Sequence, residues 1–270
     1  MSIITISRGS SSYGKETAEK LAEKLGYECV SREILIEASE QFNIPEIKLI
    51  HAIHDNPSVF NRFTHGKEKY IAYIRAALLR HLQKDNVIYH GFAGHFFLKG
   101  ISHVLKIRII ADMDDRIKIV MKRDNVPREQ AQRIIEKDDA ERHKWSRSLY
   151  GIDTWDSTLY DIVLRINKLT MDTAIEIILN AIKQPALKTT AESQLILDNL
   201  TTSALIEAKL INEFPTIRAF VENGNARIKV KTFIDKTEES TAKIKDVVKK
   251  TEGVETVELD IIPFTLDVKA

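Results

Sequence analysis

The stretch that decides the fold is Ser2-Ile3-Ile4-Thr5-Ile6-Ser7-Arg8, followed by Gly9-Ser10-Ser11-Ser12-Tyr13-Gly14-Lys15 and a helical pattern that runs to Leu25. An apolar run, a loop of small residues and a helix form, in this order, the setting that a phosphate-binding loop requires. Gly9 and Gly14 are expected to allow backbone angles that turn amide N–H groups inward and form an anion nest. The helix N-terminus and the Lys15 ammonium group add positive charge for a bound phosphate.

The loop matches the pattern Gly-x4-Gly-Lys, which a chain with so few glycines would contain by chance only about 0.03 times. The alternative is an ordinary Gly/Ser turn between a strand and a helix. Glu16 follows Lys15 where the usual motif has Ser or Thr, and the hydroxyl arrives one place later, at Thr17. Thr17 is therefore a candidate contact to phosphate or to Mg²⁺-bound water. The expected phosphate-binding residues are Gly9, Ser10, Ser11, Ser12, Tyr13, Gly14, Lys15, Glu16 and Thr17.

Composition excludes several classes of protein. The chain has 270 residues, of which 43% are hydrophobic and 29% charged, and its net charge is +1. These values are typical of a globular protein and lack the basic excess of a nucleic-acid binder. No membrane span or signal-peptide pattern is recognisable, and Cys29 as the single cysteine fits a reducing compartment. We therefore expect a cytoplasmic protein that has no membrane span and does not bind nucleic acid.

Residues 1–183 alternate between strand and helix patterns. After the first strand and helix, strands are expected at 27–30, 86–90, 104–111 and 161–166, with helices between them at 31–42, 66–84, 114–124 and 127–148, and a closing helix at 170–183. Such alternation predicts an α/β doubly wound parallel sheet with flanking helices and a lid. Ligands of this architecture bind at the carboxyl ends of the strands. His90, at the end of an expected strand, is a candidate substrate contact there.

A polar linker over residues 184–193 is expected to separate a second domain, residues 194–270. Its pattern predicts a helix, two strands, a charged helix and a last strand (α-β-β-α-β). Asn223-Gly224 lies between two apolar-rich runs, at 217–222 and 226–233, and predicts a hairpin turn. The prediction is a small α+β domain.

Short motifs along residues 1–183 carry a family resemblance. They are Ile4-Thr5-Ile6-Ser7-Arg8, Gly14-Lys15-Glu16, Glu19 to Gly26, Ser31-Arg32-Glu33, Gly91, Leu98-Lys99, Asp115-Arg116, Asp139-Ala140-Glu141-Arg142, Trp155 and Tyr160-Asp161-Ile162-Val163-Leu164. Together they resemble the cytidylate-kinase-like branch of the P-loop nucleoside-monophosphate kinases. The resemblance implies transfer of the ATP γ-phosphoryl group to a nucleoside monophosphate or similar small acceptor, with Mg²⁺ bridging the phosphates. ATP would then be the ligand of the loop.

The same resemblance implies roles for individual residues. Lys15, Arg116 and Arg142 would be catalytic, since the transition state spreads negative charge that cations stabilise. Arg32, Gly91 and Asp139 would contact the acceptor.

Two positions depart from the family pattern. Phe92 follows Gly91 where the family commonly has an arginine that touches the acceptor nucleotide, and Ser31 stands where it has an acidic residue. Losing an acceptor-side cation while keeping the donor-side loop predicts an acceptor preference other than CMP. It also leaves open a second interpretation, a nucleotide sensor that does not catalyse transfer.

The C-terminal segment resembles a BON domain, through Val221-Glu222-Asn223-Gly224-Asn225-Ala226-Arg227-Ile228 and Gly253-Val254-Glu255-Thr256-Val257. This resemblance implies a regulatory role or self-association through the C-terminal domain. In the sensor interpretation the same domain would report nucleotide occupancy.

Overall fold

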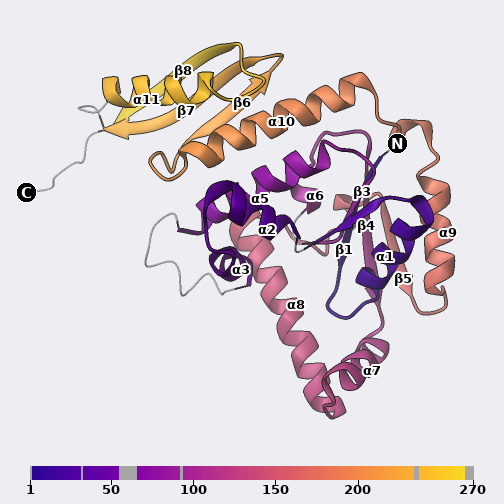
Figure 1. The fold of residues 1–270 in the computed structure, drawn as a ribbon. Coiled ribbons are helices and arrows are strands. Elements are labelled where there is room, and N and C mark those ends of the chain that lie inside the picture. Colours follow the sequence, from indigo (N-terminus) through magenta and orange to yellow (C-terminus); the bar gives the residue numbers. More distant parts are fainter. Residues whose placement is uncertain (1, 32, 55–65, 92–93, 234–236, 265–270) are drawn as a thin grey trace, which may run out of the picture. The chain divides into compact units, whose positions relative to one another are not determined.

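The computed structural model describes residues 2–31, 33–54, 66–91, 94–233 and 237–264 (Figure 1). Residues group into two compact units. Unit 1 comprises Met1–Ile34, Ile53–Asn61 and Lys84–Thr190, and unit 2 comprises Leu35–Ala52, Arg62–Gln83 and Ala191–Ala270. No helix in these described ranges combines the length and apolar character needed to cross a membrane.

Unit 1 is built on a parallel sheet of β1 (Ile3–Arg8), β2 (Glu28–Val30), β3 (Val87–Tyr89), β4 (Val104–Ala111) and β5 (Ile162–Ile166). Among the described residues the strand order is β2-β3-β1-β4-β5, and every neighbouring pair is parallel. The helices are α1 (Gly14–Leu25), α6 (Gly94–Phe97), α7 (Met113–Asp124), α8 (Arg128–Tyr150) and α9 (Met171–Ala181), with 3₁₀ turns at Ser157–Leu159 and Pro185–Leu187. The doubly wound α/β prediction is confirmed.

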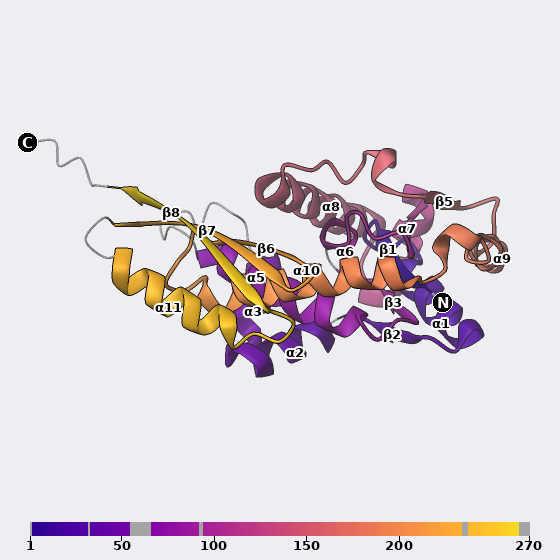
Figure 2. The same cartoon turned by 90° about the horizontal axis from the view of Figure 1, so that it is seen from above.

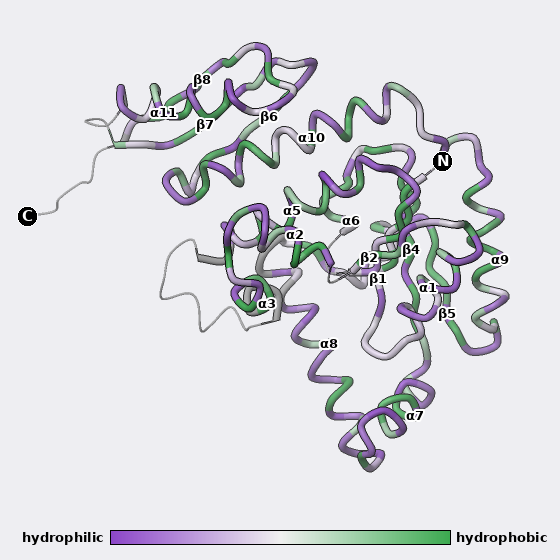
Figure 3. The backbone as a smooth tube through the Cα atoms, in the orientation of Figure 1, coloured by the Kyte–Doolittle hydropathy of each residue, from purple (hydrophilic) through white to green (hydrophobic). Residues whose placement is uncertain are grey.

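The central strand β1 is buried on both faces, since Ile3, Ile4, Thr5 and Ile6 in succession are all buried. Ile4 and Ile6 of β1 and Ile107 of β4 are fully buried in a core that also contains Leu21 of α1 and Ile175 of α9. Each such side chain contributes about 1.5–3 kcal/mol on burial. In Figure 3 the central strands are mainly hydrophobic, whereas much of α8 is hydrophilic. The apolar residues thus fix the sheet between its helices and leave the carboxyl ends of the strands to polar residues.

A smaller apolar cluster joins α7 to α8. Ile117 and Val120 of α7 are buried against Ala131 and Ile135 of α8. This pairing is important for the site, because Arg116 precedes Ile117 and Asp139 lies one helical turn after Ile135.

Unit 2 contains α5 (Gly66–Leu82), α10 (Ala191–Leu210), α11 (Thr237–Lys249) and most of α2 (Glu33–Phe42) and of α3 (Glu46–His54). Its strands are β6 (Arg218–Glu222), β7 (Asn225–Phe233) and β8 (Thr256–Phe264). β6 pairs with β7 antiparallel, and β7 pairs with β8 parallel. Asn223 and Gly224 both have positive φ, 48° and 78°, as the predicted tight hairpin turn requires. α11 packs along β7 and β8 (Figure 2). The predicted α-β-β-α-β order is confirmed.

The two units are discontinuous in the sequence. One boundary lies between Thr190 and Ala191, inside the expected linker, but unit 2 also includes helices that precede β3. Side chains explain the grouping: Arg75 of α5 forms an ion pair with Glu207 of α10 at 2.9 Å, and the Gln83 side chain donates to Asp198 Oδ1 at 2.6 Å. The helix α5 therefore packs with α10 inside unit 2.

Candidate functional site

The loop between β1 and α1 has a conformation that differs from the expected one. Its left-handed residues are Ser11 (φ 52°) and Tyr13 (φ 64°), and neither Gly9 nor Gly14 has a positive φ. The expectation that these two glycines supply the unusual backbone angles is therefore wrong. Gly14 is needed for another reason, because a Cβ atom there would lie 2.7 Å from Arg8 Cβ. The absence of a side chain lets the start of α1 approach the end of β1.

Hydrogen bonds from small side chains hold the loop. Ser12 is buried, and its hydroxyl donates to the carbonyl oxygen of Gly9 at 2.9 Å. The buried hydroxyl of Thr17 donates to the carbonyl oxygen of Tyr13 at 2.7 Å. Lys15 is exposed, and its Nζ lies 3.6 Å from Glu19 Oε1. Such an exposed pair contributes at most about 1 kcal/mol, so Lys15 is available for a phosphate.

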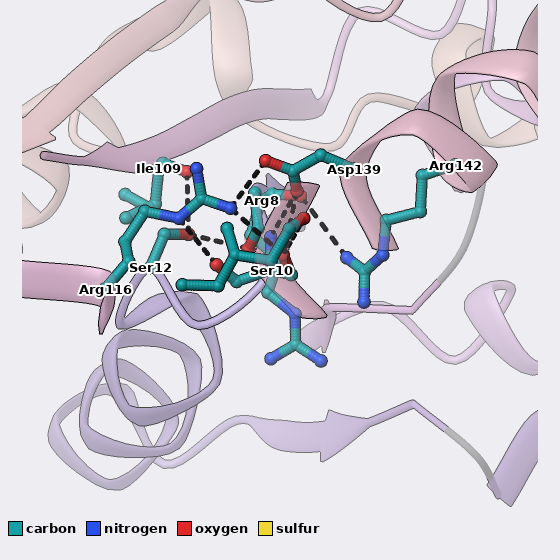
Figure 4. A network of polar contacts seen from close by, with 9 residues as sticks. Arg8, Ser10, Ser12, Ile109, Arg116, Asp139 and Arg142 are labelled. Carbon is teal, nitrogen blue, oxygen red and sulfur yellow. Dashed lines mark hydrogen bonds and ion pairs between the residues drawn. The ribbon is translucent and has the colours of Figure 1, made fainter. Parts of the chain in front are cut away.

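A polar network clamps Ser10, the second residue of the loop, to helices α7 and α8 (Figure 4). The Ser10 backbone N–H and hydroxyl donate to Asp139 Oδ1, at 3.0 and 2.8 Å. Arg116 donates from Nε to the Ser10 carbonyl oxygen at 2.8 Å, and from Nη2 to Ser10 Oγ at 3.0 Å and to Asp139 Oδ2 at 2.5 Å. Arg116 and Asp139 are thus brought together at the loop, where both interact with the same serine.

Arg142 lies near the same loop, one helical turn after Asp139. Its Nη1 is 3.5 Å from the carbonyl oxygen of Arg8. Burial lowers the pKa of the Arg142 guanidinium, and the charge of Arg116 lowers it further, whereas Asp138 and Asp139 act in the opposite direction. Burial also raises the pKa of the neighbouring Asp138 carboxyl. The end of β1 is therefore surrounded by cations in a partly desolvated place.

The acceptor side is described only in part, because Arg32 and Phe92 lie outside the described residues. Gly91 follows β3, and a Cβ atom there would lie 2.3 Å from the Tyr89 hydroxyl oxygen. Gly91 is thus required by the Tyr89 ring. His90 is buried and its Nδ1 has no hydrogen-bond partner within the described ranges. Burial lowers its pKa, and the charge of Arg8 lowers it further, so the ring is neutral at pH 7.

Sequence reasoning missed two features of this region. Arg8 was noted only within a motif, although its position at the carboxyl end of a strand, next to the loop, was a usable signal. The second feature is a cluster around Tyr160, whose hydroxyl lies 3.2 Å from Ser7 Oγ and accepts from Arg108 at 3.1 Å. The His95 ring lies against Tyr160 in a tilted arrangement, with ring centroids 5.0 Å apart and an interplanar angle of 39°. Its partners are far apart in the sequence, so no local pattern could reveal it.

The donor set fits the phosphates of a nucleotide. Loop amides, the N-terminus of α1 and Lys15 are the groups that bind such phosphates in proteins. Across the described residues no group of three or more His, Cys, Asp or Glu side chains could hold a metal ion. Mg²⁺ in phosphoryl transfer is held mainly by substrate phosphates and water, with few protein ligands. The Thr17 hydroxyl lies in the first turn of α1, is buried and already donates to the Tyr13 carbonyl oxygen, so only its capacity as a hydrogen-bond acceptor is left for Mg²⁺-bound water.

Comparison with known proteins gives three findings. A protein named cytidylate kinase from Methanosarcina acetivorans is 33% identical over 104 residues, which cover 38% of this chain and 57% of that protein. One of the same name from Sulfolobus acidocaldarius is 27% identical over 174 residues, 63% of this chain and 89% of that protein. The crystal structure of an uncharacterized protein from Eubacterium ventriosum matches with a TM-score of 0.53 and 23% identity, covering 67% of this chain and 97% of the other.

A further comparison matches the chain to the sequence profile of a protein family, over the helices and strands that form this site. The sequence profile of the Cytidylate kinase-like family matches residues 3–168, from β1 through the loop, α7 and α8 to the end of β5. This range is more than half of the chain and includes Lys15, Arg116, Asp139 and Arg142. The chain therefore belongs to the Cytidylate kinase-like family.

Proposed function

We propose that the protein transfers the γ-phosphoryl group of ATP to a nucleoside monophosphate or a similar small acceptor. The observation that carries the proposal is the loop at the end of β1, clamped at Ser10 by Asp139 and Arg116, with Arg142 beside it. Relatives named cytidylate kinase support this class of reaction. Phosphoryl transfer needs little covalent help from a protein, so positioning and positive charge are the main requirements.

On the donor side, the loop amides, the helix N-terminus and Lys15 bind the ATP phosphates. Thr17 holds phosphate or the hydration shell of Mg²⁺, which neutralises phosphate charge when bound. Arg116 already donates hydrogen bonds to Ser10 and Asp139. Its main role is therefore to keep the loop in the conformation that binds phosphate. Arg142 stabilises the charge that develops on the transferred group.

On the acceptor side, we propose that Arg32 binds the phosphate of the acceptor. Asp139 was expected to contact the acceptor, but its carboxylate bonds to Ser10 and Arg116, so we assign it an indirect role through the loop. Phe92 removes a cation that commonly contacts the nucleotide in the family. CMP is therefore the first acceptor to test, and we expect another acceptor to be preferred.

The test is an assay of ATP consumption against a panel of nucleoside monophosphates, with Lys15→Ala as the inactive control. We expect turnover with at least one acceptor, and turnover that Lys15→Ala abolishes. Tight ATP binding without turnover on any acceptor would instead support the second candidate, a nucleotide sensor, which the Phe92 substitution favours. Absence of ATP binding at millimolar concentration, with Mg²⁺ present, would reject both.

We further propose that the C-terminal segment is a BON-like module that self-associates. One face of its sheet is exposed, with Phe220 at 65% exposure. On that face Arg227 pairs with Glu258 at 3.3 Å and Lys229 with Asp260 at 3.7 Å, so a basic row lies beside an acidic row. Two copies related by a two-fold axis could place the rows opposite one another. Sedimentation of the full chain should show a dimer that Phe220→Ser weakens, and a wild-type monomer at high concentration would exclude it.

A further inference from the structure

We propose that Arg8 is a further catalytic residue, whose guanidinium contacts the phosphoryl group during its transfer. The inference rests on the proposed function and adds a residue that the family motifs did not assign. Arg8 is the last residue of β1 and immediately precedes the loop. It thus comes from the carboxyl end of a central strand, where ligands of this architecture bind.

The Arg8 stem is held in place by the loop. A Cβ atom at Gly14 would lie 2.7 Å from Arg8 Cβ and 2.8 Å from Arg8 Cδ, so the arginine stem occupies the space above Gly14. Figure 4 shows that the Arg8 guanidinium points away from the Arg116–Asp139 pair. The Arg142 guanidinium extends toward the same side as Arg8. Because the aliphatic part of Arg8 is packed against the start of α1, its guanidinium is restricted to positions close to the loop.

Arg8 is partly buried beside a second positive charge, that of Arg142, and this arrangement favours a bound anion. Within the described ranges its guanidinium forms no hydrogen bond or ion pair, while Arg142 approaches the Arg8 carbonyl oxygen at 3.5 Å. Burial lowers the pKa of Arg8, and Arg142 lowers it further, against the weaker opposite effects of Glu16 and Glu19. Desolvated like charges are unfavourable unless an anion neutralises them. A phosphoryl group bound in the site would supply that charge.

The position of Arg8 suits a contact with the transferred γ-phosphoryl group better than a contact with the other phosphates of ATP. Loop amides and Lys15 already bind the donor phosphates. β1, which ends at Arg8, pairs in parallel with β3, which His90 and Gly91 follow, and Arg142 Nη1 of α8 lies 3.5 Å from the Arg8 carbonyl oxygen. Arg8 therefore lies between the loop and the acceptor side of unit 1. A guanidinium there can bond the equatorial oxygens of a phosphoryl group in flight.

The step balances without a proton donor or oxidant. An ionised oxygen of the acceptor phosphate supplies the electron pair for the new bond to the γ-phosphorus atom. The bond between that phosphorus and the β–γ bridging oxygen breaks, and its electron pair leaves with ADP. Arg8 remains protonated throughout and only strengthens its hydrogen bonds as charge moves onto the equatorial oxygens.

The experiment compares Arg8→Gln and Arg8→Lys with Arg123→Gln, a control at an exposed arginine that bonds its neighbour Asp124. We expect Arg8→Gln to lower kcat roughly 10³-fold, within the range known for arginines that act on phosphoryl groups. ATP affinity measured by calorimetry should change less than about 3-fold, since Lys15 and the loop bind the donor. Arg8→Lys should recover part of the rate, and Arg123→Gln should match wild type.

A binding readout separates this inference from the proposed function. The probe is a transition-state analogue, ADP with Mg²⁺ and aluminium fluoride, which mimics the phosphoryl group in flight and includes no acceptor nucleoside. If wild type transfers phosphate and Arg8→Gln is equally fast, the Arg8 inference is overturned while the proposed function stands. If wild type transfers phosphate to no acceptor, the proposed function fails. The Arg8 inference is then tested by comparing the affinities of wild type and Arg8→Gln for the analogue. A tenfold weaker affinity of Arg8→Gln supports phosphate contact, and an unchanged affinity overturns it. Should Arg8→Gln misfold, Arg8→Lys takes its place in each comparison.

Discussion

The close approach of α1 to the end of β1 makes Gly14→Ala the sharpest test of the site geometry. The added Cβ would lie 2.7 Å from Arg8 Cβ and 2.8 Å from Arg8 Cδ. Arg8 Cβ is attached directly to the strand backbone, so a rotamer change cannot relieve the contact and β1 or α1 must move. Overpacking of this kind costs about 1–3 kcal/mol. Alanine gains at most about 1 kcal/mol of helix propensity over glycine, so the clash should dominate.

After the helix-propensity gain is subtracted, the largest net cost is about 2–3 kcal/mol, so we expect Gly14→Ala to lower Tm by up to roughly 12 °C. ATP affinity should fall as well, because the displaced loop no longer presents its amides. Gly9→Ala is the matched control: a Cβ there would meet the Arg116 guanidinium at 3.6 Å, an ordinary contact. Thermal melting and calorimetry with ATP measure both effects. An unchanged Tm and ATP affinity in Gly14→Ala, or an equal loss of Tm in Gly9→Ala, would refute the packing argument.

Other predictions concern the network and buried groups. Asp139→Ala should destabilise the protein by roughly 3–5 kcal/mol, because it strands the buried Arg116, and a second change, Arg116→Met, should recover part of that loss in denaturant titrations. Burial lowers the pKa of His95 to about 3, so the unfolded chain binds a proton that the folded one does not between about pH 6.5 and 3. Stability should therefore fall as the pH drops through this window, and less steeply in His95→Gln, as melting curves at several pH values can show. Lys15→Ala should lose ATP affinity, whereas Arg142→Ala should mainly lose kcat; equal kcat in wild type and Arg142→Ala would remove that residue from the mechanism.

Local patterns were sufficient for much of this protein. The strand that contains Ile3–Ile6 and the helix after the loop follow directly from residue order, since both are properties of neighbouring residues. The loop conformation does not, because Ser11 and Tyr13 have the positive φ that was expected of Gly9 and Gly14. By contrast, the Asn223-Gly224 turn follows from two residues that tolerate positive φ. The alternation of strands and helices then predicts a parallel sheet, because that is how such segments bury their apolar faces.

The tertiary structure decided what each side chain at the site does. Ser10 and Asp139 are 129 positions apart in the sequence, and only the packing of α7 on α8 brings Asp139 and Arg116 to the loop. The same holds for Arg8, whose place above Gly14 depends on how closely α1 approaches β1. Sequence determines which residues carry charge and which segments become strands or helices. The partner of each charge is set by contacts between distant segments, which no local pattern encodes.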